Sequence, residues 1–167
     1  DQYKALKQWV AESGILKIET KGSKKVVLPE LTVLGNKLIN IGVYNPFGWA
    51  VMWANLAYNS IVVNAFCLNI GVGETFNKDD IVGILKYDNS TAHAANSLLS
   101  TFRDSPIGSS LMQGIQIDKD YYRAGWEYPH AVALLYALYL YAEHTGRKSF
   151  TFSELVNAHS NPDAKGI

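Results

Sequence analysis

Residues 45–58 have the sequence NPFGWAVMWANLAY, and we expect this segment to form the central helix of the molecule. Asn45 can accept hydrogen bonds from the free backbone N–H groups at a helix start, and Pro46 suits the first turn, where no intrahelical N–H bond is lost. Trp49 and Trp53 fall on one stripe at helical spacing, and the residues around them are also apolar. A helix that is apolar on nearly every face is expected to be buried on all sides. The segment is too short to cross a bilayer, which needs about 20 apolar residues.

The composition is that of a folded globular chain. Its 167 residues are 48% hydrophobic, which fits one domain of ordinary size or two small lobes that share a core. The formal net charge is zero, so no global field attracts nucleic acid or a membrane, and no membrane partner is expected. Residues 1–40 differ from the rest, because seven lysines and four acidic residues leave a local charge of +3. The single cysteine, Cys67, excludes an internal disulfide and favours a reducing, cytoplasmic location.

The N-terminal region resembles part of a DNA-binding motif. Residues 1–14 predict an amphipathic helix that ends near Gly14, and residues 15–28 predict a β-hairpin with its turn at residues 21–24. A helix followed by a two-stranded hairpin with a basic tip corresponds to the second half of a winged-helix unit, in which the helix is the recognition helix and the hairpin is the wing. The helices that should precede this unit are missing, so we expect the chain to be a fragment of a longer protein.

Basic and polar side chains on this helix and hairpin are the candidate nucleic-acid contacts, namely Lys4, Lys7, Gln8, Lys21, Lys24 and Lys25. Lysines in these places can contact phosphates and give salt-dependent affinity. The region has no arginine, which makes the commonest specific base contact, so we expect at most weak, non-specific DNA binding. A solvated basic face without a nucleic-acid partner is an equally good interpretation.

The rest of the chain predicts a second unit of the same kind. Its expected elements are a short extended pair at 75–76, helices at 77–87 and 91–103, and strands at 111–117 and 120–124. Lys119 and Arg123 of this unit stand among acidic residues, so a structural role or a protein contact is favoured over DNA. Further helices are expected at 31–39, at 61–68 (where a β-branched run also allows a strand), from Pro129 to about 145, and at 153–159. The helix that begins at Pro129 is apolar on most faces, so we expect it to pack on the central helix.

The fold class predicted by these patterns is mostly α, with small β-hairpins, as winged-helix-like units around a central helical core. The predicted domains are residues 1–42, the C-terminal half of one winged-helix unit, and residues 43–167, a helical domain that contains the second unit at 75–126.

The sequence predicts no catalytic residue, metal site or cofactor. Cys67 stands among apolar residues, where a thiol is more often an inert core residue than a nucleophile. The spacing of His93, His130, His144 and His159 does not fit a zinc site. Three asparagines in apolar surroundings, at 55, 59 and 64, are expected to bond helix ends, because buried amides must be hydrogen-bonded.

Several segments together are similar to one family. They are residues 11–16 (AESGIL), 31–35 (LTVLG), Asn45-Pro46-Phe47 before the Trp49 and Trp53 helix, 75–79 (TFNKD), 136–141 (YALYLY) and 152–155 (FSEL). They resemble a bacterial family of unknown function that is named for phosphoadenosine phosphosulfate (PAPS) reductase or sulfurtransferase activity, and whose members occur with DNA-phosphorothioation proteins. The resemblance implies an association with sulfur transfer or DNA modification. It supplies no catalytic motif, because neither the nucleotide loop nor the reactive C-terminal cysteine of PAPS reductases occurs in this sequence.

The function expected from these observations is that of a non-catalytic accessory domain of a PAPS-reductase-related or DNA-modification protein. It would bind DNA or a PAPS-reductase-like or DNA-modification partner through a winged-helix-type surface. Two alternatives stay open. The chain could be part of a PAPS reductase or sulfurtransferase enzyme, or it could be a scaffold domain for protein–protein contact.

Overall fold

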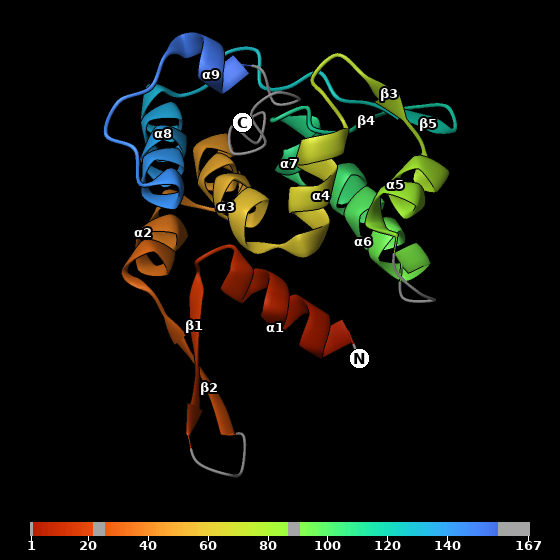
Figure 1. Cartoon of the computed structure of the whole chain (residues 1–167). Coiled ribbons are helices and arrows are strands. Elements are labelled where there is room, and N and C mark those ends of the chain that lie inside the picture. Colours follow the sequence, from red (N-terminus) through yellow and green to blue (C-terminus); the bar gives the residue numbers. More distant parts are fainter. Residues whose placement is uncertain (1, 22–25, 87–90, 157–167) are drawn as a thin grey trace.

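The computed structural model describes residues 2–21, 26–86 and 91–156. This part of the chain is mostly helical with two small antiparallel sheets, as predicted (Figure 1). Its elements in chain order are α1 (Gln2–Glu12), β1 (Leu16–Lys21), β2 (Val26–Leu31), α2 (Val33–Ile41), α3 (Pro46–Asn59), α4 (Ile61–Asn69), β3 (Thr75–Phe76), α5 (Lys78–Leu85), α6 (Thr91–Asp104), α7 (Pro106–Ser109), β4 (Ile115–Ile117), β5 (Asp120–Tyr122), α8 (Ala131–Thr145) and α9 (Phe152–Val156). The division into domains at residue 42 stays a prediction.

Helix α3 is the central element, as the sequence predicts. Asn45 caps it, because its side-chain oxygen accepts a hydrogen bond from the Phe47 N–H at 3.0 Å, and Pro46 occupies the first turn. The helix packs against α1, α4, α7 and α8, and Figure 1 shows it between α8 and α4. Trp53 is 2% exposed, and Leu56 and Ala57 are fully buried. The choice of a helix for the next segment is also confirmed, since α4 follows α3 after a single residue.

An aromatic cluster joins α3, α4, α6 and the second sheet. The Phe66 ring lies 5.1 Å from Phe76 and 5.1 Å from Phe102, measured between ring centroids. Trp53 packs on this group, 6.1 Å from Phe66 and 6.0 Å from Phe102. Aromatic rings at such distances and tilts attract one another beyond the area that they bury. This cluster is the core of the molecule and fixes where α3 lies.

The predicted N-terminal hairpin is confirmed, but its second strand is longer than expected. In the antiparallel register Leu16 pairs with Leu31 and Ile18 pairs with Pro29, so β2 continues through the proline. A two-stranded sheet has only edge strands, where a residue without an N–H is tolerated. The following helix therefore begins at Val33 and not at residue 31. Figure 1 shows the hairpin extending away from the helical body.

The second predicted unit has a three-stranded sheet. Strand β3 pairs with β5, and β5 pairs with β4, which gives the order β3-β5-β4. Helices α5 and α6 lie between β3 and the β4–β5 hairpin in sequence. The prediction of a strand from residue 111 is wrong, because residues 106–109 form the short helix α7 and β4 begins only at Ile115. Ser105 starts α7 by accepting a hydrogen bond from the Ile107 N–H at 3.2 Å.

Helix α8 begins at Ala131, two residues later than predicted. His130 is its N-cap and accepts a hydrogen bond from the Val132 N–H at 3.2 Å through Nδ1. The predicted contact between α8 and α3 is confirmed. The expectation that an apolar helix is buried on most faces fails here, because Leu135 on the outer side is 63% exposed. The C-terminal half of the predicted 153–159 helix lies outside the described residues.

Within the described ranges no single helix is long and apolar enough to cross a membrane, although α3 and α4 together meet the same criteria as a pair bent by 93°.

Candidate functional site

The candidate nucleic-acid contacts lie on α1 and the β1–β2 hairpin. Gln8 is exposed on α1, where its amide donates to the Glu12 carboxylate at 2.8 Å, and Lys7 is half-buried beside it. Lys4 is in α1 and Lys21 ends β1, but their side chains fall outside what the structure describes, as do residues 24 and 25 altogether. Among the hairpin side chains that the structure describes, Lys17 and its cross-strand partner Glu30 are charged and exposed. Of the six predicted contacts, the structure therefore places three on α1 and one, Lys21, at the end of the neighbouring strand β1.

Two asparagines of α3 hold the C-terminal end of α1. Asn55 is buried and donates from Nδ2 to the Ser13 carbonyl at 3.0 Å, and Asn59 donates to the Glu12 carbonyl at 3.1 Å. The last carbonyls of a helix have no intrahelical partner, so these bonds satisfy them. Tyr136 of α8 donates its hydroxyl to Oδ1 of Asn55 at 2.8 Å. The predicted role of these amides as helix-end contacts is confirmed, and Asn55 connects α1, α3 and α8.

Tyr136 is half-buried, and its surroundings change its acidity. Burial raises the pKa of the hydroxyl above the ordinary value, because the ionised phenolate loses hydration there. The protonated form, which donates to Asn55, is therefore the form that the folded protein favours.

Thr32 fastens the hairpin to the body. Its hydroxyl donates to the Gly14 carbonyl at 2.6 Å and accepts from the Gly35 N–H at 2.8 Å, so it caps α2 at the same time. Its backbone N–H donates to the Ile15 carbonyl at 3.0 Å. Gly35 approaches this carbonyl so closely that a Cβ atom there would lie 2.3 Å from the oxygen. The direction in which the hairpin projects is thus set by contacts at its base.

The residues of the family resemblance are structural. The Phe47 ring lies 5.0 Å from the His130 ring, and the Trp49 indole donates to the Val43 carbonyl at 2.6 Å. The Trp53 Nε1 atom is buried and has no acceptor among the described residues. Phe47 and Trp49 thus pack around the start of α3.

Arg123, which stands among acidic residues in the sequence, is completely buried. Its Nε donates to the Gln113 side chain at 2.9 Å, one Nη donates to the Ile70 carbonyl at the end of α4, and the other lies 3.8 Å from the Cys67 sulfur. The guanidinium carbon lies 5.1 Å from the centre of the Phe66 ring. Arg123 cannot contact DNA from this position. It joins β5 to the C-terminal end of α4, where positive charge is favourable.

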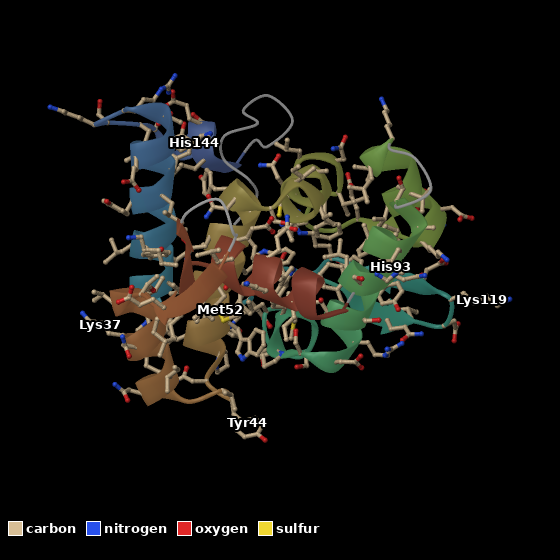
Figure 2. All side chains as sticks on the ribbon, turned by 90° about the horizontal axis from the view of Figure 1, so that it is seen from below. Lys37, Tyr44, Met52, His93, Lys119 and His144 are labelled. Atoms are coloured by element: carbon tan, nitrogen blue, oxygen red, sulfur yellow. The ribbon has the colours of Figure 1, made fainter. Side chains whose placement is uncertain are left out.

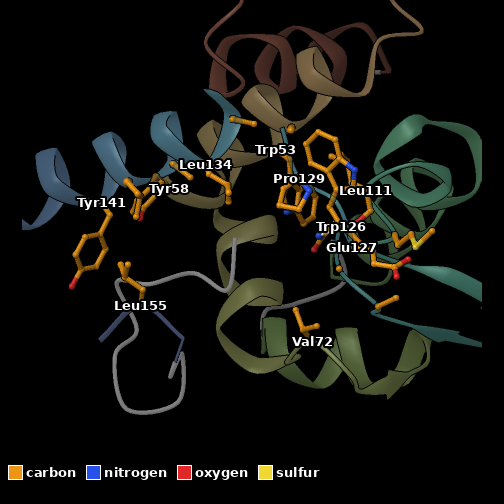
Figure 3. A pocket seen from close by; sticks show the side chains of 18 residues that line it. Trp53, Tyr58, Val72, Leu111, Trp126, Glu127, Pro129, Leu134, Tyr141 and Leu155 are labelled. Atoms are coloured by element: carbon orange, nitrogen blue, oxygen red, sulfur yellow. Dashed lines mark hydrogen bonds between the residues drawn. The ribbon is translucent and has the colours of Figure 1, made fainter. Parts of the chain in front are cut away.

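An apolar pocket lies between α3, α8 and the segments on either side of β4–β5 (Figure 3). Its volume is about 760 Å³, and its lining is mainly apolar and aromatic. Figure 3 shows Trp53 and Trp126 on one side of the space, with Tyr58 and Tyr141 towards the other. Sequence reasoning missed this pocket, because its walls come from six separate segments, which include Val72 after α4 and Leu155 of α9. The one signal was the dense aromatic run at residues 121–128, which indicates an interface or a core.

The described residues contain no group of three or more His, Cys, Asp or Glu side chains that could hold a metal ion. Cys67 is 1% exposed, which agrees with the core position expected for it. Among the histidines, His144 packs its ring 5.1 Å from Tyr58, and His93 is exposed on α6 (Figure 2), while residue 159 lies outside the described ranges.

Comparison with protein-family models, with curated proteins and with solved structures finds no match to this chain.

Proposed function

We propose that the chain is a non-catalytic binding module that contacts DNA through α1 and the β1–β2 hairpin. These elements correspond to the C-terminal half of a winged-helix unit. The observation that carries the proposal is the arrangement of these elements. A helix is followed directly by an antiparallel hairpin with six residues in each strand, and this hairpin extends away from the helical body (Figure 1). In winged-helix proteins the same order presents a recognition helix and a wing to the duplex.

Charge supports the proposal. The excess of lysine in residues 1–40 gives this region a local charge of +3, whereas the remainder carries the opposite charge. Lysine contacts with phosphates give affinity without sequence information. The proposed binding is therefore weak, non-specific and strongly dependent on salt.

The second unit has a structural role and does not contact DNA. Its order of α5, α6 and a hairpin, with β3 added at the edge of β5, is also that of a winged-helix unit. Of its two arginines, Arg123 is used inside the core and Arg103 forms an exposed ion pair with Asp104. Lys119 at the turn of the hairpin (Figure 2) stands between two aspartates in sequence. A surface of this composition has little attraction for phosphates.

The test is the affinity of the whole chain for a duplex of ~20 base pairs, measured by fluorescence anisotropy between about 50 and about 200 mM salt. We expect the logarithm of the association constant to fall linearly with the logarithm of the salt concentration, by about 0.9 per phosphate contact. Changing Lys4, Lys7, Lys24 and Lys25 to Glu should remove most of the affinity and flatten this slope.

A matched control carries the same change of charge elsewhere. Lys78, Lys86, Lys119 and Lys148 are all exposed and lie outside α1 and the hairpin. Their replacement by Glu should weaken binding far less than the N-terminal replacement. Equal losses in the two variants would show a purely global charge effect, and an affinity independent of salt would exclude the proposed mode.

A second candidate function, docking of a protein partner, is favoured by the outer face of α8. Val132, Leu135 and Tyr139 form an exposed apolar stripe at helical spacing on the side away from Ala133 and Ala137, which are buried. Exposed apolar stripes of this kind often mark protein interfaces. The partner implied by the family resemblance is a PAPS-reductase-like or DNA-modification protein.

Co-expression with such a partner tests this second function. The two chains should elute together in size-exclusion chromatography, and Leu135→Lys should separate them. Lys148→Glu, an exposed change just beyond the end of α8, is the control that should leave the complex intact. Independent elution of the unaltered chains would exclude this partner.

A further inference from the structure

We propose that the pocket between α3 and α8 binds a small organic cation with an apolar, ring-containing body. This site is separate from α1 and the hairpin, and the proposal does not depend on DNA binding. The volume of about 760 Å³ is in the range of pockets that enclose small molecules. Such pockets are usually apolar with a few placed polar groups, and this lining has the same character.

The apolar body of the ligand is inferred from the walls. Trp53 and Trp126 lie on one side of the space, and Leu134 and Tyr58 lie towards the other side (Figure 3). Trp53 is 2% exposed, so the rings open to a ligand are those of the partly exposed Trp126 and Tyr58. Leu111 and other aliphatic side chains also line the space. Flat aromatic walls favour a ligand that can stack, because ring pairs gain free energy beyond the area that they bury.

The positive charge of the ligand is inferred from the charged side chain among the residues that line the pocket, which is acidic. Glu127 is exposed at the pocket and has no ion-pair partner among the described residues. The described residues that line the pocket include no lysine, arginine or histidine. The faces of tryptophan and tyrosine rings also attract cations. A polyanion such as a phosphosulfate nucleotide would meet one carboxylate and no cation here, so the pocket is poorly suited to it.

Three probes with the same ring and different charge test the proposal, and each is titrated against the whole chain by calorimetry. They are 1-naphthylmethylamine, 1-naphthylmethanol and 1-naphthoate, which are positive, neutral and negative at neutral pH. The amine should bind most tightly and the carboxylate least. Glu127→Gln should remove the preference of the amine over the alcohol, a loss of about fivefold for one carboxylate near water.

Two adjacent substitutions on α8 locate the binding. Leu134 lines the pocket, whereas Leu135 points to the outer face, and both side chains are exposed enough to be enlarged without disturbing the core. Leu134→Trp should fill the space and weaken amine binding by more than tenfold, while Leu135→Trp should leave it unchanged. Equal binding of the three probes, no binding of any probe, or equal effects of the two tryptophan variants would overturn the proposal.

Discussion

Asn55 of α3 donates a hydrogen bond to the carbonyl of Ser13, 42 positions earlier in the chain, at 3.0 Å. The same side chain accepts a hydrogen bond from Tyr136 of α8. One buried amide thus joins the N-terminal helix, the central helix and the outer helix. The position of the proposed DNA-binding elements relative to the body depends on this contact.

Replacement of Asn55 by Ala should lower the free energy of unfolding by about 2–3 kcal/mol, because the Ser13 carbonyl and the Tyr136 hydroxyl lose a partner together. Urea denaturation measures this loss. The control is Asn69→Ala, since the exposed Asn69 amide bonds only the Ala65 carbonyl of its own helix. That change should stay within about 0.5 kcal/mol. Equal effects would mean that Asn55 is not the joint.

The stability of the protein should fall at high pH through Tyr136. The pKa of its hydroxyl is raised in the folded state, mainly by burial, so above pH 10.0 the unfolded chain loses this proton first. The contribution is therefore fully present below the ordinary pKa and is lost as the pH rises through the folded value. Tyr136→Phe should cost about 1 kcal/mol at neutral pH and make the decline above pH 10.0 shallower. Parallel stability curves for the two proteins would contradict this.

Arg123→Met should be one of the most destabilising single changes in the chain. It leaves the Ile70 carbonyl and the Gln113 side chain without their donor in the core, and we expect a loss of about 3 kcal/mol or more. Arg123→Lys should not rescue the loss, because one ammonium group cannot reproduce the planar array of donors. Arg103→Met is the matched control. Arg103 forms an exposed ion pair with Asp104, and such pairs contribute little, so thermal unfolding should be unchanged.

Gly35→Ala should loosen the base of the hairpin. The added Cβ would meet the Ile15 carbonyl at 2.3 Å, so α2 and the hairpin must separate, at a cost of about 1–3 kcal/mol. Gly83→Ala in α5 is the control and should instead stabilise the protein. The space around Gly83 is open, and alanine favours a helix over glycine by roughly 0.5–1 kcal/mol. Thermal denaturation distinguishes the two. A stabilised Gly35→Ala variant would show that the close approach is absent.

Local signals in the sequence predict most elements of this fold. Asn45 and Pro46 mark the start of α3 because capping is a property of adjacent residues. The hairpin, α4 and the α5 capping box of Asn77 and Asp80 were predictable for the same reason. The strand predicted from residue 111 was wrong, and α7 was missed because a single helical turn leaves no periodicity.

The features that sequence reasoning missed depend on contacts between distant segments. The pattern of α8 resembles that of α3, but no described element covers its outer face, so Leu135 is exposed although the helix is apolar all round. Nothing in the sequence next to Arg123 indicates that it is buried. Its burial follows from the position of β5 against the end of α4. The pocket is lined by six segments together, and the periodicity of any one segment does not predict it.

Hydrogen-exchange mass spectrometry of the chain with and without duplex DNA shows which elements contact the DNA. We expect slower exchange in peptides from α1 and the β1–β2 hairpin, at low salt, with no change in peptides that contain β4, β5 or α8. Protection that appears on α8 or on the β4–β5 hairpin, or no protection at saturating DNA, would contradict the assignment of DNA binding to the N-terminal unit.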